Sequence, residues 1–329
     1  MVTHTNAAPG SALATVTRAG VDLVPRGTSY KPRRRGAYTH GQAAAASLFL
    51  LPNLALVGLF LLVPLVLAFV ISTQKLGSLG SPQYIGIDNF ITLFRDTIFW
   101  ETVWNTAVFT IFTVPVGMVI GLGVALLLNS VLPGRTLYRS IIFLPLVISG
   151  VATGVLGSWM FDQYNGFFNK FLHAIGITGP AWQSDGKWAM ISLILVTLWQ
   201  RVGFDMLIYL AGLQGISPDL LEAAKIDGSS AWQRLRHVTV PLLGPSTFFL
   251  LIMNIIYSFQ VFDTVWALTR GGPDFSTTTV VTYAYREAFD DHGPQQLGYG
   301  AAVGVFIYLI TLAITVIQWR FSRTRDEAG

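Results

Sequence analysis

The chain has 329 residues, of which 52% are hydrophobic and only 12% carry a charge. The mean hydropathy is +0.56, and the charged share is about half of that in a soluble domain, so the composition excludes a cytosolic globular enzyme and a disordered protein. The absence of cysteine excludes a disulfide framework and thiolate chemistry, and the net charge of +4 comes without the basic, aromatic face that a nucleic-acid binder needs.

Residues 1–47 are rich in alanine, threonine, glycine and arginine without periodicity, which predicts a disordered cytoplasmic tail. Six later stretches contain few or no charges and reach the roughly 20 apolar residues that a spanning helix needs. They predict an all-α polytopic membrane protein with a transmembrane domain over residues 48–320 and a short tail over residues 321–329. The six predicted spans cover about residues 48–71, 104–128, 140–161, 188–211, 241–262 and 297–319.

The positive charges predict how the chain is oriented in the membrane. With the N-terminus in the cytoplasm, 14 of the 21 lysine and arginine residues fall in cytoplasmic segments and six in outside loops, while Arg201 lies within the fourth span. Cytoplasmic loops carry the excess of positive charge in membrane proteins. We therefore expect both termini to be cytoplasmic in a multi-pass protein of the bacterial cell membrane.

One predicted cytoplasmic loop, residues 212–240, is long enough to fold. It contains a helix start at Ser217-Pro218-Asp219, with serine as N-cap, proline at the first position and an acid in the first turn. Two helical turns over residues 220–226 are expected to end at Asp227-Gly228, because glycine readily takes the left-handed conformation at a helix end. A second helix from about Ser230 leads into the fifth span.

This loop also carries a recognisable motif. It contains Glu222-Ala223-Ala224-Lys225-Ile226-Asp227-Gly228, followed by Leu235, Val238, Pro241 and Pro245. The pattern resembles the EAA loop of ABC-importer permeases, with mild departures at Ser229 and Leu235. Residues 84–90, 258–263 and 268–273 resemble the carbohydrate-type permeases of that family, which include sugar and glycerol-3-phosphate permeases. The resemblance covers nearly all of residues 48–320 and implies the type I permease core.

The resemblance implies several partners. In the family, the short loop helix docks in a cleft of the ATPase subunit, which assigns coupling to Glu222, Ala223, Ala224, Asp227 and Gly228. The sequence lacks the phosphate-binding G-x-x-x-x-G-K-[ST] motif, so ATP and magnesium are expected on a separate ATPase and this chain is expected to be non-catalytic, with no cofactor of its own. The expected partners are a second homologous permease, an ATPase dimer, an extracytoplasmic solute-binding protein and membrane lipid, with no nucleic acid.

Two predicted spans carry polar residues that suit a substrate. Arg201 and Asp205 are four residues apart on the fourth span, so they share a face and can pair. Ionisable residues inside a membrane are functional candidates by default, and the alternative is a structural ion pair. The resemblance implies a translocation site between spans four and five. The predicted substrate-binding residues are Arg201, Phe204, Asn254, Tyr257, Ser258 and Val261, expected to face one space, with Gln200 and Gln260 as further candidates.

The predicted function is translocation of a sugar or oligosaccharide by an ATP-driven importer. A first alternative is a glycerol-3-phosphate or glycerophosphodiester permease, in which Arg201 would meet a phosphate. An ion-coupled secondary transporter is the alternative from another class; it predicts inverted repeats and broken helices at matching positions, which the sequence does not show. The five histidines have no metal-ligand spacing, and no nucleophile–base pair suggests an enzyme.

Overall fold

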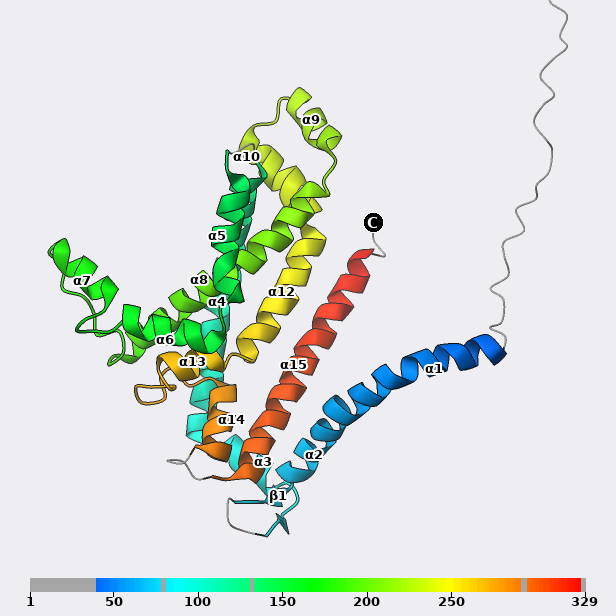
Figure 1. The fold of residues 1–329 in the computed structure, drawn as a ribbon, viewed down its shortest axis with the longest axis vertical. Helices are drawn as coiled ribbons and strands as arrows, with labels where there is room; N and C mark the ends of the chain where they lie inside the picture. The colour runs from blue at the N-terminus through cyan, green and yellow to red at the C-terminus, as the bar shows by residue number, and fades with distance from the viewer. Residues whose placement is uncertain (1–39, 78–80, 131–132, 291–294, 327–329) are drawn as a thin grey trace, which may run out of the picture. The chain divides into compact units, whose positions relative to one another are not determined.

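The computed structural model describes residues 40–77, 81–130, 133–290 and 295–326 (Figure 1). Regular structure in these residues is almost entirely helical, and the two short strands β1 (Gln74–Lys75) and β2 (Gln83–Tyr84) form an antiparallel ribbon. The predicted all-helical membrane fold is therefore confirmed. Residues 1–39 of the predicted N-terminal tail and residues 327–329 of the C-terminal tail lie outside the described part of the chain.

Helix α1 (His40–Val57) belongs to a first compact unit that ends at Gly58. It begins well before residue 48, the predicted start of the first span. The run Ala43–Ala46 accounts for the difference, because alanine has the highest helix propensity of all residues. Residues 48–72 are long and apolar enough to cross a membrane.

The second unit is built on three long helices, α4 (Thr97–Asn129), α8 (Gly186–Gln214) and α15 (Leu297–Asp326). Each contains a candidate membrane span. Helix α4 turns glycines toward α8, and a Cβ atom added at Gly121 would lie only 2.5 Å from the Cβ of Asp205. Glycine at this position therefore permits close packing of α4 and α8, around a core that includes Val114, Met118, Met206 and Leu210.

The third predicted span is broken. A single helix was expected over residues 140–161, but the structure has α5 (Arg135–Val147) and α6 (Gly150–Met160), bent by 99°. Pro145 lies in the last turn of α5, where its missing backbone N–H removes one hydrogen bond and weakens the helix. The helix ends two residues later at Val147, and Ile148 is extended. Ser149 then starts a new helix by accepting a hydrogen bond from the Ala152 backbone N–H at 3.2 Å.

The fifth predicted span, residues 241–262, differs at both ends. The short segments α10 (Ala231–Arg234), η2 (Leu235–Thr239) and α11 (Val240–Leu242) lead to α12 (Gly244–Phe259), and a 66° bend lies between α11 and α12. Pro245 in the first turn of α12 lacks the N–H that would join the two segments. The helix stops before Val261, and the next helix is α13 (Asp263–Leu268). The described residues thus contain four unbroken candidate spans, or six if each bent pair counts as one.

The two ends of the second unit carry different elements (Figure 1). One end holds α9 (Pro218–Ile226) and α10, and the other holds β1, α3 (Asp88–Arg95) and α14 (Val280–Phe289). Two further α-helices belong to the unit: α2 (Val63–Ser72), which packs against α15, and α7 (Phe167–Ala174), which lies between α6 and α8 in the chain.

A carboxylate fixes the end that holds α3 and α14. Asp96 caps α4 by accepting from the Ile98 backbone N–H at 2.9 Å, and it also accepts hydrogen bonds from the phenols of Tyr283 and Tyr299. Burial opposes ionisation of Asp96, but these hydrogen bonds outweigh it and lower its pKa below the usual 3.8. Burial and the nearby Asp96 carboxylate raise the pKa of Glu287 on α14. Asp96 thereby joins α4, α14 and α15.

Candidate functional site

Arg201 on α8 lies between two aromatic rings. Its guanidinium carbon is 3.9 Å from the ring centroid of Tyr257 on α12 and 5.1 Å from that of Phe204, one turn further along α8. A guanidinium at these distances is attracted by the negative face of an aromatic ring, most strongly where water is excluded. The two rings therefore fix where the positive charge lies.

Asn254 connects Arg201 to Asp205. The Arg201 Nη2 donates a hydrogen bond to Asn254 Oδ1 at 3.3 Å, and Asn254 Nδ2 donates to Asp205 Oδ1 at 2.8 Å. Asp205 is 1% exposed and Asn254 6% exposed. A buried charge is tolerated only when it is paired and hydrogen-bonded. The arginine and aspartate share a helix face as predicted, and their linkage runs through an amide from a second helix.

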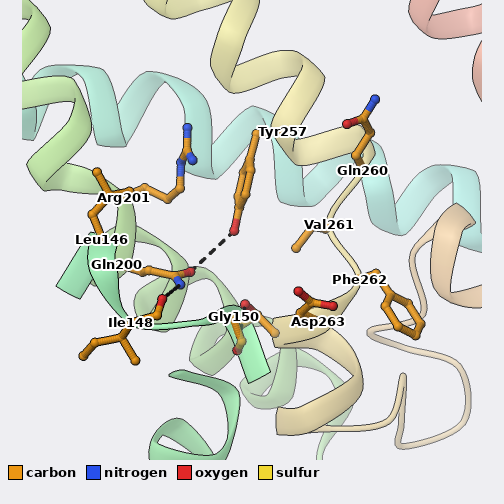
Figure 2. A pocket seen from close by; sticks show the side chains of 11 residues that line it. Leu146, Ile148, Gly150, Gln200, Arg201, Tyr257, Gln260, Val261, Phe262 and Asp263 are labelled. Atoms are coloured by element: carbon orange, nitrogen blue, oxygen red, sulfur yellow. Dashed lines mark hydrogen bonds between the residues drawn. The ribbon is translucent and has the colours of Figure 1, made fainter. Parts of the chain in front are cut away.

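A cavity of about 300 Å³ opens on one side of this cluster (Figure 2). Its walls come from the bend between α5 and α6, from α8, and from the junction of α12 with α13. The lining residues are Leu146, Ile148, Gly150, Gln200, Arg201, Tyr257, Gln260, Val261, Phe262, Asp263 and Thr264. The volume is at the lower end of the range for small-molecule sites.

Hydrogen bonds across the cavity tie three elements together. Gln200 Nε2 donates to the Ile148 carbonyl at 3.2 Å and to Thr153 Oγ1 at 3.1 Å. The Tyr257 hydroxyl donates to Gln200 Oε1 at 3.4 Å, as Figure 2 shows. The Ile148 carbonyl is available because the helix breaks at that residue. The cavity therefore offers an aromatic face, amides, a guanidinium and the carboxylate of Asp263, which suits non-covalent binding of a polar ligand.

The structure separates the predicted substrate-binding residues into three groups. Arg201, Tyr257 and Val261 line the cavity, while Phe204 and Asn254 contact Arg201 without lining it. Ser258 is elsewhere: its hydroxyl accepts from Thr110 Oγ1 on α4 at 2.9 Å. Neighbouring positions on a helix point about 100° apart. Tyr257 and Ser258 therefore face different helices, and the prediction that all of these residues face one space does not describe Ser258.

Sequence reasoning missed the cavity residues that belong to helix breaks. Ile148 and Gly150 lie at the α5–α6 bend, and Asp263 and Thr264 begin α13. The available signal was Pro145 followed by Ser149-Gly150, which is typical of a helix stop and restart. Within the described residues, no group of three or more histidines or acids is placed to hold a metal ion.

The predicted coupling loop is folded as a helix and a capped turn. Helix α9 starts at Pro218, and Gly228 follows it with a φ of +82°, which favours glycine. Ser230 and Gln233 then cap α10 reciprocally. Glu222, Ala223, Asp227 and Gly228 are exposed, and Ala224 is half-buried.

Exposed apolar side chains flank the acids of α9. Ile226 is 86% exposed, Trp232 66% and Leu220 50%. The α9 loop lies at the end of the second unit opposite to α3 and α14 (Figure 1).

Fold and site together define a multi-pass membrane protein with a polar cavity among its helices. Residues 114–326 match the family of binding-protein-dependent transport system inner membrane components, and the chain belongs to this family. The chain is thus a transport permease of the ABC-importer type, and the family predicted from the loop motif is confirmed.

Relatives of known transport systems match over nearly their whole length. The sulfoquinovosyl glycerol permease SmoG of Agrobacterium fabrum is 34% identical over 290 residues, which is 87% of this chain and 92% of SmoG. The sn-glycerol-3-phosphate permease UgpA of Yersinia pestis is 35% identical over 276 residues, covering 83% of this chain and 92% of UgpA. A chain of a bacterial alginate ABC transporter, solved with a pentasaccharide-bound periplasmic protein, has a TM-score of 0.76 at 26% identity and covers 86% of this chain and 96% of its own.

Proposed function

We propose that this chain is a permease subunit of an ATP-driven importer that translocates a carbohydrate or carbohydrate derivative delivered by an extracytoplasmic binding protein. The cavity beside Arg201 and Tyr257 carries the proposal. Its aromatic face can stack on a sugar ring, and Gln200, Gln260 and Asp263 can exchange hydrogen bonds with hydroxyl groups. The relatives named above support it, because each name refers to a glycoside of glycerol, a glycerol phosphate or a polysaccharide.

A phosphorylated glycerol derivative is the second candidate substrate. Arg201 lines the cavity and a guanidinium recognises phosphate in a bidentate manner, and the UgpA relatives transport sn-glycerol 3-phosphate. Two observations favour a neutral sugar: Arg201 already bonds to Asn254, and the cavity wall also carries the Asp263 carboxylate. An anionic ligand in the cavity would lie near the Asp263 carboxylate, which repels it, as well as near the Arg201 guanidinium.

The energy for transport comes, in this proposal, from a separate ATPase dimer that binds ATP and magnesium. Helix α9 docks in a cleft of the ATPase through Glu222, Asp227 and the exposed Ile226. Its short connection to α8, and its connection to α12 through α10, η2 and α11, transmit movement to the cavity. The proposal places α9 and both termini in the cytoplasm, and it pairs the chain with a second, homologous permease.

Movement of the helices would expose the cavity alternately to the two sides. The bends between α5 and α6 and between α11 and α12 are the positions at which rigid helices can change direction. A sugar held only by stacking and hydrogen bonds can then leave toward the cytoplasm.

Reconstitution tests the proposal directly. The chain is assembled in proteoliposomes with its second permease, ATPase and binding protein, and uptake of labelled neutral sugars and of sn-glycerol 3-phosphate is measured. Uptake that requires ATP and survives collapse of ion gradients supports the proposal. Uptake that an ionophore abolishes at constant ATP supports the ion-coupled alternative, and preference for the phosphorylated compound supports the second candidate substrate.

A further inference from the structure

A second and much smaller cavity shares Arg201 and Tyr257 with the cavity of the proposed site. Its volume is about 20 Å³, and it lies among α4, α8 and α12. A cavity of roughly 10–15 Å³ is enough for one water molecule, provided that two to four polar groups surround it. The lining residues are Thr113, Val114, Gly117, Thr197, Leu198, Arg201, Asp205, Asn254 and Tyr257.

Two buried polar atoms on residues that line this small cavity have no protein partner. They are Thr197 Oγ1 and Arg201 Nε, on residues one turn apart on α8, and the Thr197 residue is 2% exposed. Neighbours four positions apart lie on the same helix face, so both atoms can reach one ligand. A buried donor or acceptor without a partner is costly, and nearly all such groups in proteins are satisfied by protein or by ordered water.

Asp205 supplies a third polar group. Its Oδ1 accepts from Asn254, whereas its Oδ2 lies on the α4 side, 3.1 Å from the position that a Cβ on Gly117 would take. Gly117 itself lines the small cavity. The residues around the cavity therefore supply a guanidinium N–H donor, a hydroxyl group and a carboxylate acceptor.

We propose that one water molecule is bound in this cavity and that Thr197 is a positioning residue for Arg201. The water accepts a hydrogen bond from Arg201 Nε, donates one to Asp205 Oδ2, and is held in place by the Thr197 hydroxyl. The occupant is a water molecule because the Arg201 guanidinium and the Asp205 carboxylate on the wall offset each other's charge, and the volume excludes a larger ligand.

The bound water also affects the cavity of the proposed site. Arg201 is connected to Asp205 by two routes, one through the amide of Asn254 and one through the water. Both routes restrain the arginine, so the guanidinium stays on the Tyr257 ring. This consequence for substrate binding rests on the proposed function, whereas the water site itself does not.

The experiment uses the full importer complex in lipid nanodiscs, with three variants of this chain. Thr197→Val removes the hydroxyl at nearly constant volume, Thr197→Ser keeps it, and Gly117→Ala displaces the water sterically while leaving Thr197 intact. A cryo-electron microscopy map that resolves ordered water is expected to show one density between residues 197, 201 and 205 in the wild type and in Thr197→Ser. The density is expected to be absent in the other two variants.

Transport measurements supply the second readout. The concentration of carbohydrate-loaded binding protein at half-maximal uptake is expected to rise about 2- to 10-fold in Thr197→Val and Gly117→Ala, the range for loss of one hydrogen bond, and to recover in Thr197→Ser. A wild-type map without density in the cavity overturns the proposal, as does a Thr197→Val complex that keeps the density or the wild-type uptake curve. A complex that shows the water but takes up no carbohydrate supports the water site and contradicts the proposed function.

Discussion

The α9 loop and the centre of the α8–α12 pair reach their structures in opposite ways. In the loop, the functional candidates are exposed and the fold follows from neighbouring residues: Pro218 starts the helix, Gly228 ends it, and Ser230 caps the next one. At the centre, Arg201 depends on residues far away in the sequence, such as Asn254 and Tyr257. A substitution in the loop should therefore alter communication with a partner, whereas one at the centre should alter the stability of this chain.

The largest effect is expected from Arg201→Gln, because it leaves Asp205 buried without a compensating charge. Breaking a direct, fully buried ion pair on one side costs about 3–5 kcal/mol, and the loss here should be smaller because Arg201 is half-buried and reaches Asp205 through Asn254. The double variant Arg201→Gln/Asp205→Asn should recover much of this loss, because it removes both charges. Thermal unfolding of the purified chain in detergent measures the three free-energy changes. Strict additivity of the two single changes would show that the residues do not interact, and would remove the contrast with the loop.

Gly228→Trp should reduce uptake by more than tenfold while membrane insertion and unfolding temperature change little. The φ of +82° costs a non-glycine residue about 1–2 kcal/mol, and open space beside the residue removes any internal clash. Gly176 is a matched control, because it also has a positive φ of +80° and open space, and it lies after α7. Equal loss of uptake in Gly176→Trp would show that backbone strain, and not coupling at α9, causes the effect.

In Tyr257→Ala the concentration of loaded binding protein at half-maximal uptake should rise about tenfold, because the change removes the ring that contacts Arg201 and lines the cavity of the proposed site. A desolvated cation–ring contact is worth about 2 kcal/mol. Ser258→Ala is the control, because Ser258 faces Thr110 on α4. Uptake by the reconstituted importer is measured for both variants as a function of the concentration of loaded binding protein. If Ser258→Ala has the larger effect, the translocation site lies on the α4 side of α12.

The smallest effect concerns pH at the end that holds α3 and α14. The folded pKa of Asp96 lies below 3.8, so its contribution to stability is complete above that pH and is lost as the pH falls through the folded pKa. The pKa of Glu287 is raised above 4.5, so its contribution falls as the pH rises through the folded value. Unfolding temperatures between pH 3 and 7 should show both slopes. Asp96→Asn should remove the loss of stability at low pH, and Glu287→Gln should remove the loss of stability as the pH rises. An unchanged dependence of unfolding temperature on pH in both variants would show that neither residue causes it.

The candidate site shows where prediction from sequence reached its limit. Helical spacing placed Arg201, Phe204 and Asp205 on one face correctly, because i, i+3 and i+4 neighbours share a face whatever surrounds them. The same spacing placed Ser258 in one space with Tyr257, although the Ser258 hydroxyl accepts a hydrogen bond from Thr110 on α4. A periodic pattern states which residues share a broad face but not which neighbouring helix each one meets.

The amino-acid sequence by itself determined the membrane fold and the local structure of the α9 loop. Long apolar stretches specify spanning helices because a backbone in lipid must satisfy its own hydrogen bonds, and proline, glycine and capping residues act within one or two turns of the chain. Only the tertiary structure decided the 99° bend between α5 and α6, the amide between Arg201 and Asp205, and the two cavities beside them. These features depend on contacts between residues as far apart as Gln200 and Ile148 or Arg201 and Asn254, and local sequence contains no information on which distant side chains will meet.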